Sequence, residues 1–290
     1  MTVRLLCAAL LFMPALCAAY RVEDDDRATI ELAGPAQRIV SLAPGATAML
    51  FAAGAGGRIV GTSAYSDEPA AAQKIERIGD AQSLNLERIL ALHPDVVVVW
   101  TGGTSLTEIA RLQRVGLRIY HHHVTRLEQM PDSLKRLGVL TGTQSEAAAA
   151  ANELAGQIAS LRSQYSMLSR ASVFIQVWDK PLYTVGKDEI ITDVIHMCGY
   201  RSTYDDLSDV SPAVTIESVL ARDPDVILAL DSDPKSPQHW LLQWHAFGSM
   251  RAVRTGHLLA WSDPRLIRMG PSEVEAAATL CKALHTVNAK

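Results

Sequence analysis

Three consecutive histidines, His121, His122 and His123, are the residues whose type most directly suggests chemistry. Imidazole nitrogens are common ligands of transition metals. The run ends an apolar segment that we predict to be a strand, where neighbouring side chains point to opposite faces, so only His121 and His123 could share one ion. Two ligands do not complete a closed site. A secreted metal-dependent enzyme built on this run is therefore a remote alternative, and we expect the histidines to line a cleft wall or face water.

Motifs of common catalytic sites are missing from the sequence. It has no G-x-S-x-G elbow, no H-E-x-x-H pair and no P-loop. The glycine-rich text at 54–57 is only GAGG and follows a predicted helix, which does not match a dinucleotide-binding fingerprint. We therefore predict a protein that is not an enzyme and has no catalytic cofactor and no metal site.

Aromatic residues follow the predicted strands of both halves of the chain: Tyr65, Trp100, Trp178 and Trp261. Ligands of α/β proteins bind beyond the carboxyl ends of the strands. Aromatic rings at such ends can be simple packing, but four of them, with polar neighbours, favour one shared cleft. The pattern predicts a site for a flat or bulky ligand.

One phrase occurs twice. LERILALHPDVVVVW at 86–100 returns as IESVLARDPDVILAL at 216–230, and the gapless alignment pairs Glu87 with Glu217. Each copy predicts a helix, a Pro-Asp turn and a buried strand. A carboxylate in the first turn interacts favourably with its own helix dipole, which accounts for each Glu separately. Matched carboxylates on two similar units would also suit docking to two matched cations of a symmetric partner.

Apolar runs alternate with amphipathic segments on both sides of an alanine-rich stretch, 145–169, that contains no proline. Runs such as 96–99 are continuously apolar and β-branched, as is typical of parallel strands covered on both faces. The stretch 145–169 predicts one long helix. We predict two three-layer α/β lobes with parallel-rich sheets, joined by a backbone helix, with a ligand cleft between them. The boundaries are a signal peptide at 1–19, an N-terminal lobe at 20–143 that opens with a hairpin, the backbone helix at 144–169 and a C-terminal lobe at 170–290.

The N-terminus resembles a targeting segment. Arg4 precedes an apolar run at 5–16, too short to span a bilayer, and small residues at 17–19 suit cleavage before Tyr20. The alternative is lipoprotein processing at Cys17, but Leu16 is bulky where a small residue is wanted. The net charge of −4 over 290 residues gives no reason to expect nucleic acid as a partner.

After cleavage two cysteines remain, Cys198 and Cys281. Export permits a disulfide between them, whereas two buried free thiols are the alternative. We favour the disulfide, which would tie the end of the chain to a helix in the second lobe.

Several segments together resemble periplasmic solute-binding proteins of the helical-backbone class, which serve ABC importers of metal chelates. Within that class the chain is most similar to the cobalamin-binding members. The resemblance runs through the following segments: RIVSLAPGATAMLFAAG, VGTSAYSDEP, QKIERIGD, NLERILALHPDVVVVWTGG, GKDEI, ESVLARDPDVIL and LCKAL. It implies a periplasmic monomer that captures a corrinoid and delivers it to the permease dimer of an ABC transporter.

The resemblance also implies roles for individual residues. Tyr65 of the YSD segment and Trp100 before the glycine pair would contact the ligand, and Trp178 is adjacent to another contact position. A late segment that begins at Ser262 would contribute Asp263 and an arginine. Because that segment is one residue longer than in the family, either Arg265 or Arg268 could serve.

The family's two permease-docking carboxylates fall on Glu87 and Glu217. Its cysteine pair falls on Cys198 and Cys281, which supports the disulfide.

Three positions depart from the family pattern. Ala81, Val177 and Ser211 stand where aromatic residues are expected. The ligand could therefore be another corrinoid, haem or an iron-siderophore chelate. The histidine run and Tyr65 are consistent with haem as an alternative ligand, because imidazole and phenolate both bind haem iron.

Overall fold

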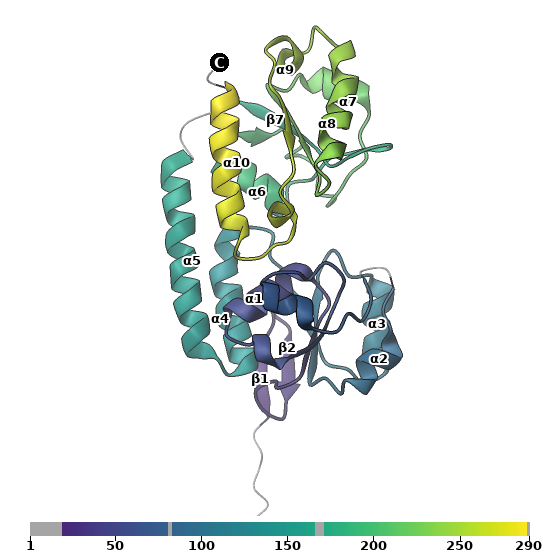
Figure 1. Cartoon of the computed structure of the whole chain (residues 1–290), viewed down its shortest axis with the longest axis vertical. Helices are drawn as coiled ribbons and strands as arrows, with labels where there is room; N and C mark the ends of the chain where they lie inside the picture. The colour runs from purple at the N-terminus through teal and green to yellow at the C-terminus, as the bar shows by residue number, and fades with distance from the viewer. Residues whose placement is uncertain (1–18, 81–82, 166–170, 289–290) are drawn as a thin grey trace, which may run out of the picture.

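The structure is a computed structural model that describes residues 19–80, 83–165 and 171–288. Figure 1 shows two α/β lobes, one above the other, beside a group of long helices that runs along both. The predicted two-lobe α/β architecture is confirmed. The predicted signal peptide lies almost wholly outside the described residues, as does Cys17.

The N-terminal lobe is built on a four-stranded sheet in the order β4-β3-β5-β6, in which every pair of neighbours is parallel. Its strands are β3 (Ile39–Ser41), β4 (Ile59–Thr62), β5 (Val96–Trp100) and β6 (Ile119–His122). Its helices are α1 (Pro44–Ala52), α2 (Leu86–Ala91) and α3 (Leu106–Arg114), with 3-10 turns η1 (Gly56–Arg58) and η2 (Ala70–Lys74). An antiparallel hairpin of β1 (Tyr20–Glu23) and β2 (Thr29–Leu32) opens the lobe, as predicted.

The C-terminal lobe repeats this plan with a parallel sheet in the order β10-β7-β11-β12. Its strands are β7 (Ser172–Gln176), β10 (Arg201–Ser202), β11 (Val226–Leu230) and β12 (Leu258–Trp261), with a small hairpin of β8 (Trp178–Asp179) and β9 (Leu182–Tyr183). Its helices and 3-10 turns are α6 (Ile190–Met197), α7 (Ile216–Arg222), α8 (Lys235–Leu241), η4 (Leu242–Ala246), α9 (Arg251–Arg254) and η5 (Pro264–Ile267).

Three helices form the backbone of the molecule: α4 (Met130–Thr141), which follows η3 (Leu127–Gln129), α5 (Gln144–Tyr165) and α10 (Glu273–Asn288). Helix α5 is the alanine-rich segment, and its small residues let α4 approach closely. A Cβ on Gly138 of α4 would lie 2.4 Å from the Cβ of Ala147. Gly142 ends α4 with a left-handed backbone (φ 69°), a conformation that glycine adopts at little cost.

The buried strands face two apolar layers, which explains why their residues are continuously hydrophobic. Val96 and Val98 belong to the core cluster shared with the backbone helices, whereas Val97 and Val99 belong to the cluster on the opposite face of the sheet. The shared cluster includes Ile175 of the C-terminal lobe, so one continuous apolar core runs through both lobes.

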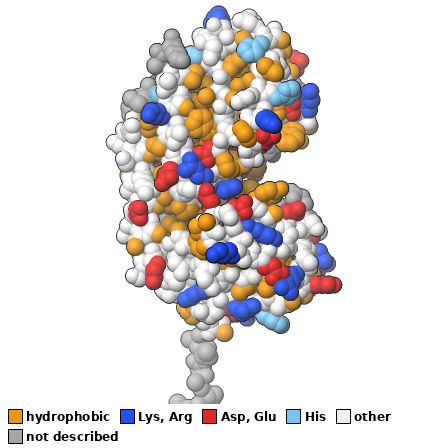
Figure 2. All heavy atoms as spheres, viewed as in Figure 1, with side chains coloured by type: hydrophobic (Ala, Val, Ile, Leu, Met, Phe, Trp, Pro, Cys, Tyr) orange, Lys and Arg blue, Asp and Glu red, His pale blue; other side chains and the backbone are white. Residues whose placement is uncertain are grey.

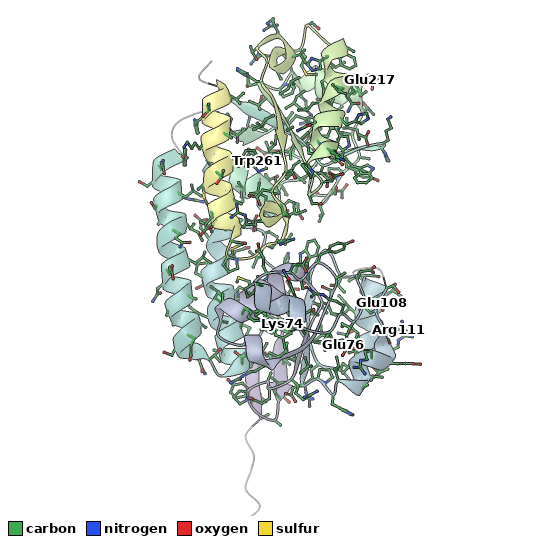
Figure 3. The ribbon with its side chains drawn as sticks, viewed as in Figure 1. Lys74, Glu76, Glu108, Arg111, Glu217 and Trp261 are labelled. Carbon is green, nitrogen blue, oxygen red and sulfur yellow. A yellow bond between two sulfur atoms is a disulfide. The ribbon has the colours of Figure 1, made fainter. Side chains whose placement is uncertain are left out.

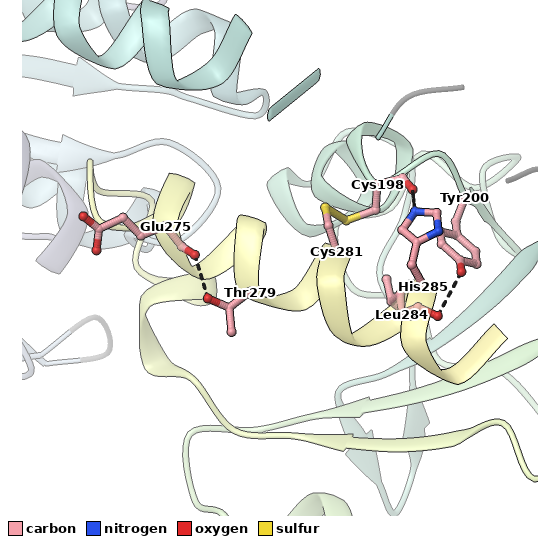
Figure 4. The surroundings of a disulfide bond; sticks show 7 residues. All are labelled: Cys198, Tyr200, Glu275, Thr279, Cys281, Leu284 and His285. Atoms are coloured by element: carbon pink, nitrogen blue, oxygen red, sulfur yellow. Dashed lines mark hydrogen bonds between the residues drawn. A yellow bond between two sulfur atoms is a disulfide. The ribbon is translucent and has the colours of Figure 1, made fainter. Parts of the chain in front are cut away.

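The predicted disulfide is confirmed. Cys198, at the end of α6, is bonded to Cys281 in α10, and both residues are fully buried. Figure 4 shows the bond beside His285, whose Nε2 donates to the carbonyl oxygen of Cys198 at 2.7 Å. The hydroxyl of Tyr200 donates to the carbonyl oxygen of Leu284 at 3.0 Å. The last helix is thus held against the second lobe by covalent and polar contacts.

Candidate functional site

The carboxyl ends of both parallel sheets are followed by the loops that carry the predicted ligand contacts. Figure 2 shows the surface hollowed between the two lobes. A cavity of about 30 Å³ also lies where the lobes meet, lined by Trp100 and His122 of the first lobe and by residues 267–269 of the second. The arrangement leaves a cleft between the lobes whose walls come from chain segments far apart in the sequence.

In the N-terminal lobe, Tyr65 and Trp100 lie at or just after the carboxyl ends of β4 and β5. Tyr65 follows β4 with a left-handed backbone (φ 63°) and is 75% exposed. Trp100 ends β5, and its backbone N–H donates to the hydroxyl of Thr104 at 3.1 Å. The loop folds back over the indole so closely that a Cβ on Gly103 would lie 1.7 Å from a ring carbon. Glycine at 103 is therefore what lets the ring keep this position.

In the C-terminal lobe, Trp178 lies on the β8–β9 hairpin, with 51% of the residue exposed. Its ring lies 6.0 Å from that of Trp240, and its Nε1 donates to the carbonyl oxygen of Lys180 at 3.2 Å. Trp261 ends β12 and packs against the shared core, with a buried Nε1 that has no hydrogen-bond partner among the described residues. Of these two tryptophans, Trp178 is the one open to a ligand.

Asp263 and Arg265 form a tight ion pair at the start of η5. The carboxylate of Asp263 accepts hydrogen bonds from the backbone N–H of Arg265 at 3.0 Å and from its Nη2 at 2.7 Å. These hydrogen bonds hold the pKa of Asp263 below its usual range. The pair is thus charged and oriented by its own loop.

Arg268 has a different setting, because it contacts the opposite lobe. Its Nη1 lies 3.6 Å from Oε1 of Glu68, and Oε2 of Glu68 accepts a hydrogen bond from the hydroxyl of Ser272 at 2.7 Å. Beside it, a Cβ on Gly45 would lie 1.9 Å from the carbonyl oxygen of Arg268. The loop with Tyr65 is therefore joined directly to the segment with Arg265.

The histidine run meets the turn of the opening hairpin. His121 and His123 both contact Asp26, with Nδ1–carboxylate distances of 3.6 and 2.6 Å, so they do share one side. His122 is buried, and its Nδ1 lies 3.0 Å from Oδ2 of Asp25. Within the described ranges, no three His, Cys, Asp or Glu side chains are gathered so that they could hold a metal ion.

Three carboxyl groups near the lobe junction were not anticipated from the sequence: Asp193 and Glu273 are buried and Glu189 is partly buried. Burial raises the pKa of Glu189 to about 7. Burial also raises the pKa of Asp193, whose carboxylate accepts the backbone N–H of Leu127 at 2.9 Å. Glu273 is fully buried, and this burial, with the charges of Asp193 and Glu189, raises its pKa well above the usual value. No local pattern marks these residues, because α6 and α10 meet only in the folded chain.

Glu87 and Glu217 lie in the first turns of α2 and α7, and both are exposed. Each helix has a side-chain N-cap: Asn85 accepts the N–H of Arg88 at 3.0 Å, and Thr215 accepts that of Ser218 at 3.2 Å. Figure 3 shows Glu217 on the right-hand face of the C-terminal lobe, and Figure 1 places α2 on the same side of the N-terminal lobe. The helices that carry the two carboxylates, α2 and α7, thus lie on the same side of the molecule in this view.

The three positions that depart from the expected aromatic pattern have small or partly buried side chains where the structure describes them. Val177 packs against the shared core. Ser211 is exposed, and its hydroxyl donates to the carbonyl oxygen of Thr184 at 3.3 Å. Ala81 lies outside the described residues.

Comparison with known proteins finds a family match and close relatives. Residues 39–264 match the model of a family described as periplasmic binding protein. The vitamin B12-binding protein of Salmonella paratyphi A is 35% identical over 257 residues, which cover 87% of this chain and 92% of that protein. The vitamin B12-binding protein of Vibrio cholerae serotype O1 is 31% identical over 250 residues, which cover 86% and 90%.

Solved structures agree in fold. The crystal structure of the periplasmic vitamin B12-binding protein of Vibrio cholerae matches with a TM-score of 0.78 at 30% identity, covering 88% of this chain and 99% of that one. A periplasmic haem-binding protein from Roseiflexus matches with a TM-score of 0.74 at 22% identity, covering 87% and 98%, and shows the shared fold alone.

Proposed function

Because the chain belongs to the periplasmic binding protein family, we propose that it captures cobalamin or a related corrinoid in the periplasm and delivers it to an ABC-transporter permease. The observation that carries the proposal is the similarity to vitamin B12-binding relatives along nearly the whole of both chains. On this proposal the protein is a carrier and not an enzyme. In the part of the chain that is described, no helix combines the length and apolarity needed to cross a membrane.

The side chains around the cleft favour a large ligand with a polar edge. Tyr65 and Trp178 are exposed rings from opposite lobes, and Trp100 is a partly exposed ring that lines the cavity where the lobes meet. These rings would pack on the macrocycle. Asp263 and Arg265 would hydrogen-bond the amide groups at its edge, because a preformed ion pair offers both acceptors and donors.

Of the two arginines, Arg265 is the better ligand contact. Its partner Asp263 belongs to the same loop, so the pair can turn together toward a ligand. Arg268 is instead held toward Glu68 of the other lobe. We assign Arg268 to the contact between lobes.

Isothermal titration of the purified mature protein with cyanocobalamin tests the ligand. Saturable binding heat and a ligand-dependent rise in melting temperature are expected. Titration with no heat and no thermal shift would exclude cobalamin and leave the family assignment intact.

A second candidate keeps the fold and changes the ligand to haem or an iron chelate. The observation that favours it is the exposed phenol of Tyr65, since phenolate can bind ferric haem iron. Addition of haemin would then give a Soret band that Tyr65→Phe removes. A spectrum identical to that of free haemin would argue against this candidate.

Glu87 and Glu217 would dock the carrier on two matched cations of the permease dimer, with a monomeric carrier bridging both subunits. Charge reversal of both residues to Lys should abolish vitamin uptake while the affinity for cyanocobalamin stays unchanged. The matched control reverses two exposed carboxylates elsewhere, Glu31 and Glu153, and should leave uptake near the wild-type level. Equal uptake by both double variants would contradict the docking roles.

A further inference from the structure

The imidazole of His122 is a buried polar group with only half of its hydrogen-bonding capacity used. The residue is 1% exposed. Its Nε2 is buried and has no hydrogen-bond partner among the described residues. Buried polar atoms in folded proteins are almost always satisfied, so an unpaired nitrogen indicates a partner that the protein chain itself does not supply.

The other ring nitrogen is firmly held. Nδ1 lies 3.0 Å from Oδ2 of Asp25. The same carboxylate accepts hydrogen bonds from the hydroxyl of Ser133 at 2.7 Å and from Nε of Arg136 at 2.8 Å. Burial works to raise the pKa of Asp25, but the hydrogen bonds that its carboxylate accepts, from His122 first and then from Ser133 and the backbone N–H of His123, outweigh burial and hold the pKa far below its usual range.

This arrangement fixes the tautomer of the neutral ring. An ionised carboxylate only accepts hydrogen bonds, so Nδ1 of His122 must carry the proton that faces Asp25. The neutral ring then has a bare lone pair on Nε2. His122 is therefore a preoriented hydrogen-bond acceptor, supported from behind by Asp25, Ser133 and Arg136.

His122, whose Nε2 is unpaired, lines the small cavity at the lobe junction. The cavity has a volume of about 30 Å³ and is lined from both lobes, by residues 43–46, Trp100, His122 and residues 267–269. His122 and Trp100 are paired neighbours at the ends of β6 and β5. A space of this size holds one water-sized polar group. It is far too small for a macrocycle, but it suits the tip of one substituent.

We propose that His122 is a ligand-contacting residue whose Nε2 accepts a hydrogen bond from a terminal N–H of the bound corrinoid, namely one of its primary carboxamides. This inference rests on the proposed function and assigns a specific contact to its site. A bare acceptor at this place selects a carboxamide over the corresponding carboxylate, because a carboxylate has no hydrogen to donate and would face the lone pair with an oxygen. His122 thus distinguishes a ligand that has a carboxamide at this position from one that has a carboxylate there.

Binding measurements on matched variants test this contact. His122→Phe keeps a planar ring and removes the acceptor, whereas His122→Gln keeps an acceptor oxygen. We expect His122→Phe to weaken cyanocobalamin binding about tenfold, the size of one hydrogen bond, and His122→Gln to bind close to the wild-type affinity. Melting temperatures without ligand show whether each variant is folded.

The second arm changes the ligand. The probes are the monocarboxylic acids of cyanocobalamin, in which single carboxamides are replaced by carboxylates. Wild-type protein should bind one isomer about tenfold more weakly than cyanocobalamin, and His122→Phe should lose that discrimination. The proposed contact is refuted if folded His122→Phe binds cyanocobalamin as tightly as the wild type does. It is also refuted if this variant discriminates among the acids as well as the wild type does. A wild-type protein that binds no corrinoid overturns instead the proposed function.

A measurement without ligand checks the premise. Long-range ¹H–¹⁵N correlation spectra of the free protein at neutral pH should show His122 as the Nδ1–H tautomer, and Asp25→Asn should alter that signal. Observation of the Nε2–H tautomer would refute the acceptor role whatever the ligand is.

Discussion

The carboxyl group of Glu189 gives the clearest pH dependence at the scale of single residues. Burial raises its pKa from 4.5 to about 7, with the charge of Asp188 adding to the shift and that of His123 opposing it. A carboxyl group with a raised pKa in the folded protein costs stability once the unfolded chain has ionised. The cost is therefore absent below about pH 4.5, grows as pH rises and is complete above about pH 7.

Glu189→Gln should remove this cost. We expect the free energy of unfolding to rise by about 2–3 kcal/mol at pH 8 and to change little at pH 4. Urea unfolding at the two pH values measures the difference. Glu153→Gln, at an exposed carboxylate, is the control and should be neutral at both. Equal effects of Glu189→Gln at pH 4 and pH 8 would refute the assigned ionisation.

Gly103 provides a steric test of the Trp100 wall. A Cβ at this position would lie 1.7 Å from the indole, so Gly103→Ala must displace the ring or the loop. We expect weaker cyanocobalamin binding, by about tenfold or more, with a destabilisation of about 1–3 kcal/mol from overpacking. Gly57→Ala is the matched control, because a Cβ there meets nothing within 4 Å. Unchanged affinity in Gly103→Ala would show that the position of Trp100 does not matter for the ligand.

At the scale of elements, the loop after β4 and the segment that begins with η5 are joined through Glu68 and Arg268. The first carries Tyr65 and the second carries Arg265, so this contact links the loops that hold two proposed ligand-binding groups from opposite lobes. Both partners are partly exposed, and their attraction is accordingly screened by solvent.

A double-mutant cycle on Glu68→Gln and Arg268→Gln measures this contact. We expect a coupling energy of about 0.5–1 kcal/mol in stability, and a loss of ligand affinity that is no larger in the double variant than in either single one. Glu76→Gln with Arg88→Gln is the control, an ion pair within one lobe, and should leave affinity unchanged. Additive losses of affinity at Glu68 and Arg268 would mean that the two residues act separately.

At the scale of the whole molecule, the backbone helices and the disulfide hold the C-terminal lobe and the last helix together. The bond joins residues that are 83 positions apart, and a cross-link over so long a loop restricts the unfolded chain strongly. Cys198→Ser with Cys281→Ser should lower the free energy of unfolding by about 2–4 kcal/mol.

Cyanocobalamin affinity should survive in the folded double variant, since the disulfide lies among α6, α10 and their core and not among the proposed ligand contacts. Denaturant unfolding and titration of the same preparation separate the two effects. A large loss of affinity in a protein that is still folded would place the disulfide in the binding mechanism.

Local patterns in the sequence determined the architecture. Continuous β-branched runs such as residues 96–99 predict parallel strands covered on both faces, and the alanine-rich, proline-free stretch predicts the helix observed at Gln144–Tyr165. The repeated phrase placed Glu87 and Glu217 at equivalent positions of two helices. These features depend on periodicity and propensity over short segments, so the sequence alone was sufficient for them.

The tertiary structure alone decided which distant side chains meet. The sequence left Arg265 and Arg268 equivalent, and only packing of the lobes shows one paired within its loop and the other with Glu68. The sequence indicated that the three histidines end a strand. It did not show that the partner of His122 is Asp25, 97 positions earlier. Hydrogen bonds and desolvation depend on distances of a few ångströms between segments, and no local pattern encodes those distances.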